Sequence, residues 1–162
     1  MDYVAEIYNL SSKFYKDHSI NQYPEILVKP NRPYACLLVN YMDDLFLCIP
    51  FRSHISHKYA YHFKNSNRSR RCRSGLDYTK IALIKNDYYI DGNTPVVVDQ
   101  DEYKETIQNL DRIVREVVRY VDDYKNHTNG VKVLHEREWK RRYGLSTLPY
   151  YDYLLLNTKA TE

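Results

Sequence analysis

The sequence predicts an α+β fold: a strongly twisted antiparallel sheet, or a small barrel-like core, with surrounding helices that include one long helix. Two patterns indicate this class. Short runs of β-branched and aromatic residues, separated by turn residues, fill the first half of the chain, and a helical stripe of apolar residues follows from Asp101. The 162 residues, 43% of them hydrophobic, can bury one core, so we expect a single domain over residues 1–162.

The N-terminal segment is expected to begin the sheet. Residues 3–8 alternate as a strand does, and capping side chains before Lys13 start a short helix over residues 13–17. Pro24, Pro30 and Pro33 then interrupt regular structure, because proline disfavours helix for the residue before it. This places the two basic side chains of that stretch, Lys29 and Arg32, on a loop.

The clearest strand signal is a hairpin. Residues 34–41 and 45–51 are rich in aliphatic and aromatic side chains, and Met42-Asp43-Asp44 between them is typical of a turn. We expect two buried strands that pair with each other. Further short strands, of which the last two pair with each other, are expected over residues 57–63, 79–84 and 88–90.

The apolar period changes to that of a helix after Asp101. Apolar side chains recur at intervals of four and three from Tyr103 to Tyr124, which places them in one stripe. We expect one helix of about 24 residues that packs on the core, since the stripe covers only about three heptads and is too short for a typical coiled coil. Two shorter helices are expected nearer the C-terminus, over residues 136–143 and 147–156.

Several functional classes are disfavoured by composition. No apolar run approaches the length of a membrane span, and the first residues lack the features of a secretory signal, so we expect a cytoplasmic protein with no membrane partner. The three cysteines have no CxxC spacing, which argues against a disulfide framework and a zinc site. The absence of Walker A and GxGxxG patterns disfavours nucleotide chemistry, and we expect no metal and no cofactor.

Charge is distributed unevenly along the chain. The formal net charge is only +3, but residues 45–76, here called the basic tract, contain no Asp or Glu. The tract carries seven cations: Arg52, Lys58, Lys64, Arg68, Arg70, Arg71 and Arg73. Aromatic and histidine side chains are interleaved with them: Phe51, His54, His57, Tyr59, Tyr61, His62 and Phe63. This combination suits single-stranded or looped RNA, which needs phosphate-pairing cations and stacking surfaces; the alternative is a solvated basic loop.

The end of the second hairpin strand offers reactive side chains. Arg52, Ser53, His54 and His57 follow the buried run, where a strand end would hold them rigidly. Cleavage of RNA without a metal requires a base or positioning group for the 2′-hydroxyl, a cation for the charge that develops on phosphorus, and an acid for the 5′-oxygen. Histidine suits the acid and base roles because its ordinary pKa lies near physiological pH.

Three segments, in this order, resemble the toxins of type III toxin-antitoxin systems. They are Lys29-Pro30-Asn31-Arg32-Pro33-Tyr34 before a buried strand, residues 49–59, and Ser74-Gly75-Leu76-Asp77-Tyr78-Thr79-Lys80 before another strand. The CptN and TenpN toxins are the nearer branch, with ToxN and AbiQ more distant, and the similarity runs from about Tyr3 to the segment 150–156.

The resemblance implies a fold and an activity. The expected fold is the twisted antiparallel sheet of ToxN, similar to the MazF and Kid toxins. The expected activity is metal-independent endoribonuclease cleavage of cellular mRNA that leaves a 2′,3′-cyclic phosphate and a 5′-hydroxyl, with a role in abortive infection and phage defence. A repeated RNA antitoxin that folds into pseudoknots would inhibit it from the same groove, in an assembly with two or more toxin copies and no DNA.

The match to the family motif is incomplete. ToxN-like members have a Thr-Ser followed by a lysine at the strand end, whereas here Arg52-Ser53 is followed by His54. Ser53 matches and the lysine does not. A basic position upstream in the family corresponds to Lys29 or Arg32, and Lys80 fits a further basic position.

These correspondences define a hypothesis for the site. Ser53 would position the 2′-hydroxyl or the phosphate, and Lys29 or Arg32 would act with Arg52 on the developing charge. His57 or Lys80 would transfer a proton. The residues expected to bind RNA are Arg32, His54, Lys58, Tyr59, Lys64, Arg68, Arg70, Arg71, Arg73, Tyr78 and Arg141.

Two other classes of function stay open. A small RNA-binding regulator without nuclease activity would use the same basic tract but would not depend on Ser53 or His57. A protein-protein adaptor would use the tyrosine-rich surface, since the chain has 18 tyrosines against 4 phenylalanines. An adaptor would show little salt dependence with any RNA.

Overall fold

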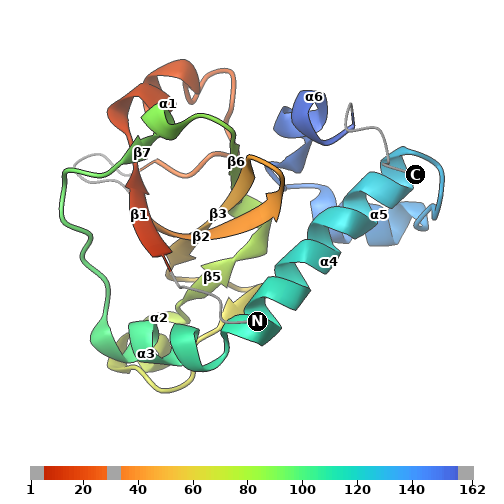
Figure 1. The fold of residues 1–162 in the computed structure, drawn as a ribbon. Helices are drawn as coiled ribbons and strands as arrows, with labels where there is room; N and C mark the ends of the chain where they lie inside the picture. The colour runs from red at the N-terminus through yellow and green to blue at the C-terminus, as the bar shows by residue number, and fades with distance from the viewer. Residues whose placement is uncertain (1–5, 29–33, 157–162) are drawn as a thin grey trace.

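An antiparallel sheet of seven strands forms the centre of the computed structural model, which describes residues 6–28 and 34–156 (Figure 1). The strands pair in the order β4-β5-β3-β2-β1-β7, and β6 pairs with β3 beside β5. Their bounds are β1 Glu6–Leu10, β2 Ala35–Met42, β3 Leu45–Arg52, β4 Ala60–His62, β5 Gly75–Asp77, β6 Ala82–Ile84 and β7 Ile90–Asp91. Within the described strands the sheet is open, with β4 and β7 at its ends. The α+β class and the antiparallel sheet are therefore confirmed.

The β2–β3 hairpin forms where the sequence predicts it. Cys36 pairs with Pro50 and Leu38 with Cys48, so the two apolar runs lie in register. The turn places Asp43 at a φ of 44°, a left-handed conformation that aspartate tolerates better than most residues. Asn40 stabilises this turn by donating from its side-chain amide to the Asp43 carbonyl at 3.1 Å. Local polar chemistry thus fixes the pairing of the two central strands.

Two predictions about the later strands are wrong. Residues 78–80 form a 3-10 turn, because the Asp77 carboxylate caps the Thr79 amide and turns the chain; only Ala82–Ile84 remain extended as β6. The segment 88–90 does not pair back on β6. A second 3-10 turn at Asp87–Tyr89 carries the chain away, and β7 pairs with β1 instead.

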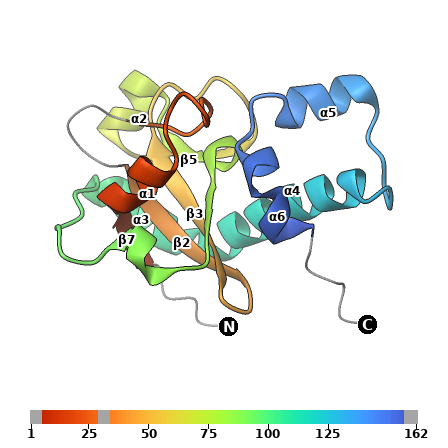
Figure 2. The same cartoon turned by 90° about the horizontal axis from the view of Figure 1, so that it is seen from above.

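Six α-helices surround the sheet in the described part of the chain. The long α4 lies along one side of the sheet with α5 beyond it, α6 lies near β6, and α2 and α3 lie together at one end (Figures 1 and 2). Their bounds are α1 Ser12–Asp17, α2 Asn67–Cys72, α3 Gln100–Gln108, α4 Leu110–Thr128, α5 Glu136–Tyr143 and α6 Asp152–Leu155. No described helix has the length and apolar character to cross a membrane.

The expected helix of about 24 residues is instead two helices that meet at Asn109. The Asn109 side chain donates to the Glu105 carbonyl and so ends α3, while the Asn109 carbonyl accepts the first bond of α4. The apolar stripe does not govern α3: Ile107 is 47% exposed, whereas Glu102 and Glu105 are buried. Polar partners of those two carboxylates set the rotation of α3, as described below.

The C-terminal helices agree with the sequence in part. Helix α5 covers residues 136–143 as predicted. The last expected helix is a 3-10 turn over Leu148–Tyr151 followed by the single turn of α6.

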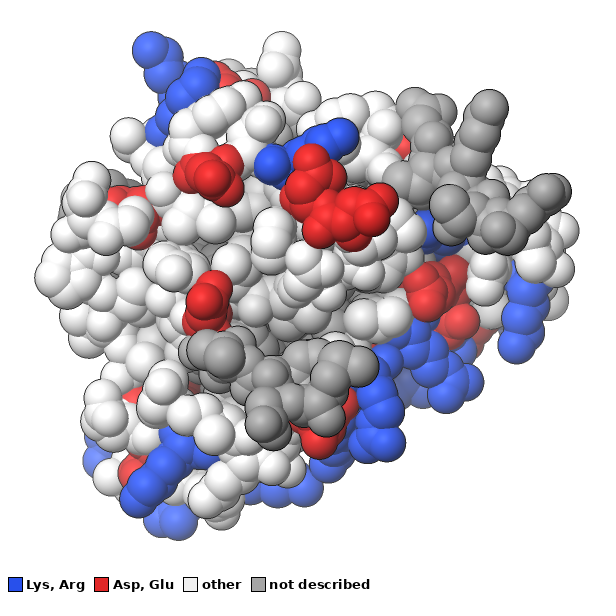
Figure 3. All heavy atoms as spheres, viewed as in Figure 1, with Lys and Arg blue, Asp and Glu red and all other residues white. Residues whose placement is uncertain are grey.

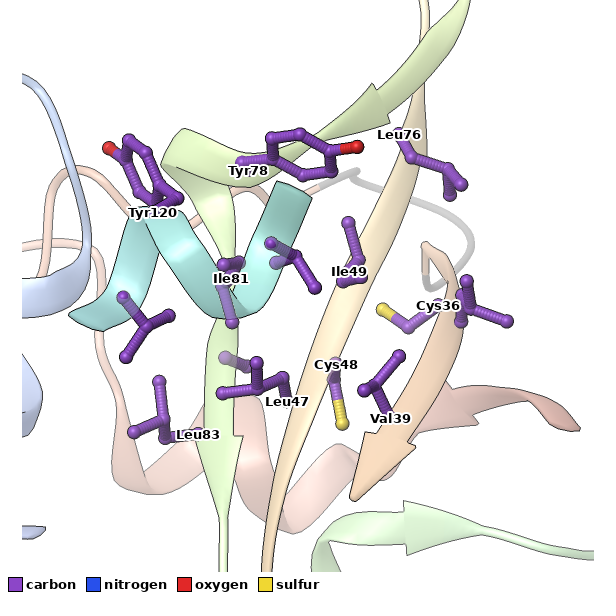
Figure 4. Close-up of a cluster of buried hydrophobic side chains, with 14 of the residues drawn as sticks. Cys36, Val39, Leu47, Cys48, Ile49, Leu76, Tyr78, Ile81, Leu83 and Tyr120 are labelled. Atoms are coloured by element: carbon purple, nitrogen blue, oxygen red, sulfur yellow. The ribbon is translucent and has the colours of Figure 1, made fainter. Parts of the chain in front are cut away.

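The core lies between the sheet and α4. Side chains from β2, β3, β5 and β6 meet the apolar stripe of α4, in which Ile113, Val117 and Val121 are fully buried. Burial raises the pKa of the Cys36 thiol to about 12, so this cysteine acts as a small apolar side chain. Figure 4 labels ten members of this core: Cys36, Val39, Leu47, Cys48, Ile49, Leu76, Tyr78, Ile81, Leu83 and Tyr120.

Candidate functional site

A buried carboxylate at the end of β5 organises the candidate site. Asp77 is fully buried, and its Oδ1 accepts hydrogen bonds from the Thr79 amide at 2.9 Å and the Thr79 hydroxyl at 2.6 Å. The same oxygen lies 3.2 Å from His57 Nε2. The other oxygen, Oδ2, accepts from Arg52 Nη1 at 2.7 Å. Asp77 therefore joins the end of β3 to the loop that carries His57.

The pKa of Asp77 reflects this environment. Burial alone would raise the pKa, but hydrogen bonds from His57, Thr79 and Arg52 outweigh it and lower the value to about 2. Asp77 is therefore ionised at neutral pH and holds a fixed negative charge beside His57.

This shift predicts a pH dependence of stability. Since the pKa of Asp77 is lower in the folded chain than in the unfolded chain, its contribution is complete above about pH 5 and is lost as the pH falls toward 2. We expect the stability difference between the wild type and Asp77→Asn to shrink by about 2 kcal/mol between pH 6 and pH 2. Urea unfolding at both pH values measures this, and an unchanged difference would contradict the ionised, hydrogen-bonded state of Asp77.

Hydrogen bonds fix the tautomer and the orientation of the His57 ring. Its Nδ1 accepts from the Tyr59 amide at 3.1 Å, so in the neutral ring the proton is on Nε2, which faces Asp77. The ring also stacks on Tyr59, with the centroids 6.1 Å apart. The main-chain carbonyl of His57 lies 2.8 Å from His62 Nε2. His57 is thus held by a carboxylate on one side and by its own loop on the other.

A cavity of about 720 Å³ lies beside His57, between the segment 55–64 and helices α4 and α5. We call it the basic groove. Its charged or titratable side chains are His57, Lys58, His62, Lys64, Arg73, Arg112, Glu116, Arg119, Asp123 and Arg142, and Tyr59, Tyr78 and Tyr120 add aromatic surface. Six Lys and Arg against two carboxylates give the groove the positive potential that attracts polyanions.

The cations of the groove differ in their partners. Arg112 pairs with Glu116 at 3.0 Å, and Arg142 pairs with Asp123 and Glu138. Lys58, Lys64 and Arg73 are exposed and have no carboxylate partner among the described residues. These three therefore have their charges available for phosphates. On the face seen in Figure 3, Lys and Arg atoms gather at the lower right, over α4, whereas most acidic atoms lie higher.

Ser53 lies in a different cavity from His57. This second cavity, of about 540 Å³, is lined by Asn9, Ala35, Phe51, Ser53, Arg68 and the segment 94–99 without Val96. Arg52 and Ser53 are successive residues at a strand end, so their side chains leave on opposite sides. Arg52 turns toward Asp77, and Ser53 toward the second cavity. The structure therefore places Ser53 and His57, which the sequence hypothesis combines in one site, in different cavities.

Other predicted site residues have partners elsewhere. Lys80 donates to Glu25 Oε2 at 2.6 Å and to the Leu145 carbonyl at 2.8 Å, and it does not line the basic groove. Arg68 pairs with buried Glu102, and Arg141 with Glu138. These contacts hold the three side chains against other parts of the fold.

The remaining predicted residues divide into three groups. Lys58, Tyr59, Lys64, Arg73 and Tyr78 line the groove, but the buried Tyr78 hydroxyl donates to Glu116 at 2.9 Å. His54, Arg70 and Arg71 are exposed outside it, His54 at a φ of 60°. Lys29 and Arg32 lie outside the described residues.

Sequence reasoning missed several groove residues. It also gave no role to Asp77, which is buried beside His57 and does not line the groove, although Asp77 is the first carboxylate after the basic tract and belongs to the segment 74–80 that resembles the toxin family. Arg112 and Arg119 are seven residues apart on α4 and so share a face, a spacing that the sequence already contains. On α5 the groove residue is Arg142 instead of Arg141. Only the packing of α4 and α5 reveals that these arginines face the basic tract.

No group of three or more His, Cys, Asp or Glu side chains in the described ranges is arranged to hold a metal ion. The side chains available for chemistry are the His57–Asp77 pair, His62 and the cations around them. Comparison of the chain with protein-family models, curated proteins and solved structures finds no match.

Proposed function

We propose that this protein is a metal-independent endoribonuclease whose products carry a 2′,3′-cyclic phosphate and a 5′-hydroxyl. The observation that carries the proposal is His57, which lines a groove with three cations unpaired in the described part of the chain and whose Nε2 lies 3.2 Å from the buried carboxylate of Asp77. A carboxylate behind an imidazole fixes its orientation and stabilises the imidazolium form during proton transfer. A groove with cations and aromatic rings suits single-stranded RNA.

Each of these side chains has a separate role in the reaction. The 2′-oxygen forms a bond to phosphorus while the bond from phosphorus to the 5′-oxygen breaks, and one proton leaves the first oxygen as another reaches the second. His57 is the group that transfers a proton. Lys58, Lys64 and Arg73 bind the phosphates and offset the charge that develops on them. Arg52 is a positioning residue, because it holds Asp77 and does not line the groove.

The biological setting of the proposal comes from the sequence resemblance. On that basis the protein is a cytoplasmic toxin of a type III toxin-antitoxin system with a ToxN-like, MazF-like or Kid-like core. Its RNA antitoxin, a pseudoknot repeat, occupies the basic groove and blocks access of mRNA. The positive potential of the groove supports this partner, because phosphate contacts dominate the affinity for any RNA.

A non-catalytic RNA-binding regulator is the second candidate, and one observation favours it. Both ring nitrogens of His57 already have protein partners, since Nδ1 faces the Tyr59 amide and Nε2 faces Asp77. Catalysis requires RNA to displace the Tyr59 amide from Nδ1. A regulator has no such requirement.

One assay distinguishes the nuclease from the regulator and shows which of the two cavities holds the reacting groups. Single-stranded RNA is incubated with the purified protein in EDTA, and the product ends are identified for the wild type, His57→Gln and Ser53→Ala. We expect cyclic-phosphate ends with the wild type and with Ser53→Ala. For His57→Gln we expect the cleavage rate to fall at least about 100-fold, which is the order of magnitude for the loss of a general acid or base. His135→Asn is the matched control, because asparagine preserves the cap that His135 gives α5.

Other outcomes would redirect the proposal. Loss of cleavage in Ser53→Ala alone would move the chemistry to the second cavity. RNA that stays intact but is bound tightly, and is released by salt, would favour the regulator.

A further inference from the structure

A second histidine lines the basic groove, and the reaction described above gives it no role. His62 ends β4, is half-buried and lines the same cavity as His57. Its Nε2 lies 2.8 Å from the His57 carbonyl oxygen. A carbonyl oxygen only accepts, so Nε2 must carry the proton and donate it to this bond. The lone pair of neutral His62 is therefore on Nδ1.

The two histidines of the groove differ at Nδ1. In His57 this atom accepts a hydrogen bond from the Tyr59 amide at 3.1 Å. In His62 it has no hydrogen-bond partner among residues 6–28 and 34–156. His62 thus has a fixed tautomer and an unoccupied basic nitrogen, which is the arrangement that a proton acceptor requires.

The reaction needs two proton transfers, and one imidazole serves only one of them at a time. The carboxylate of Asp77 stabilises positive charge on His57, so His57 suits the role of acid. His62 Nε2 donates to a main-chain carbonyl, which fixes the tautomer with the lone pair on Nδ1, and no carboxylate pairs with this ring among the described residues. The surroundings of the two rings therefore separate the acid role from the base role.

We propose that His62 is the general base of this site, an inference that rests on the proposed nuclease function. His62 Nδ1 accepts the proton of the 2′-hydroxyl as the 2′-oxygen bonds to phosphorus. His57, as the imidazolium, donates its Nδ1 proton to the departing 5′-oxygen, which takes the place of the Tyr59 amide. One proton is gained and one is lost, and exchange with water restores both rings.

The His62→Gln variant tests this role against a purely structural one. The amide nitrogen of glutamine can still donate to the His57 carbonyl, but glutamine offers no basic atom at the position of Nδ1. We expect cleavage to fall by about 100-fold with RNA affinity unchanged. If His62 only anchors the loop through its bond to His57, His62→Gln will cleave at the wild-type rate and the inference is overturned.

A modified substrate distinguishes the base from the acid. RNA with sulfur in place of the bridging 5′-oxygen at the cleaved bond has a leaving group that departs without a proton. This substrate is expected to restore the rate of His57→Gln but not that of His62→Gln. Restoration of the His62→Gln rate would overturn the assignment of His62 as base.

The outcomes also separate this inference from the proposed function. Wild-type activity with an inactive His57→Gln and a fully active His62→Gln would leave the nuclease standing and remove His62 from it. A wild type that leaves all RNA intact would remove both. Thermal unfolding of each variant beside His135→Asn shows whether a lost rate reflects a lost fold.

Discussion

Asp77→Asn is expected to reduce RNA cleavage by roughly 10³- to 10⁴-fold, the effect of removing a carboxylate that orients a catalytic imidazole. The substitution removes the charge that stabilises the imidazolium of His57, 3.2 Å away. It also leaves Arg52 Nη1, now 2.7 Å from the carboxylate, without an anionic partner. Breaking one side of a fully buried ion pair costs about 3–5 kcal/mol. The Arg52 side chain is 28% exposed, so we expect a smaller loss here, and the variant should still unfold at a lower urea concentration.

A double substitution separates the loss of activity from the loss of stability. In Arg52→Gln/Asp77→Asn both charges are gone and two amides face each other. We expect most of the stability to return, because the uncompensated charge is removed, while cleavage stays at the level of Asp77→Asn. Recovery of cleavage together with stability would mean that Asp77 has only a structural role.

Glu105→Ala is expected to destabilise the fold by about 3–5 kcal/mol, since it removes a buried carboxylate that satisfies several donors. Glu105 is 3% exposed and accepts from the Tyr61 hydroxyl at 2.9 Å and from the Lys64 and Asn65 amides at 3.0 Å. Alanine would leave two main-chain amides and a phenol without acceptors. The loss is a large fraction of the whole stability of a typical domain, about 5–15 kcal/mol.

Urea unfolding measures this effect, with Glu138→Ala as the control. Glu138 lies on the surface of α5 and pairs with Arg141 and Arg142, and surface ion pairs contribute less than about 1 kcal/mol each. The midpoint should fall sharply for Glu105→Ala and little for Glu138→Ala. Equal shifts of the urea midpoint in the two variants would contradict the expectation that the buried carboxylate of Glu105 stabilises the fold more than a surface carboxylate does.

The fold was predictable where the determining pattern is local. The β2–β3 hairpin and α5 depend on apolar alternation and on turn or capping residues near in sequence. The pairing of β7 with β1 joins residues 80 positions apart, as in Leu10 with Ile90, and no local pattern specifies it. The break at Asn109 escaped prediction for a related reason, since the buried partners of Glu102 and Glu105 come from residues 61–74.

The candidate site was predictable to a similar degree. The acid-free tract indicated His57, Lys58, Lys64 and Arg73, because charge and residue type are visible in the sequence. The direction of a side chain at a strand end is not visible, so Ser53 was grouped with His57 although the two line different cavities.

The pairing of the sheet also has a consequence for how the chain folds. Strand β3 pairs with β2 and, along its other edge, with β5 and β6, while β1 pairs with β7. Except for the hairpin, these pairings join distant parts of the chain, so most loop-closure entropy is lost before the contacts that offset it form. We therefore expect folding to start from the hairpin, which is the most local of these pairings. During synthesis the sheet is complete only after β7 has left the ribosome.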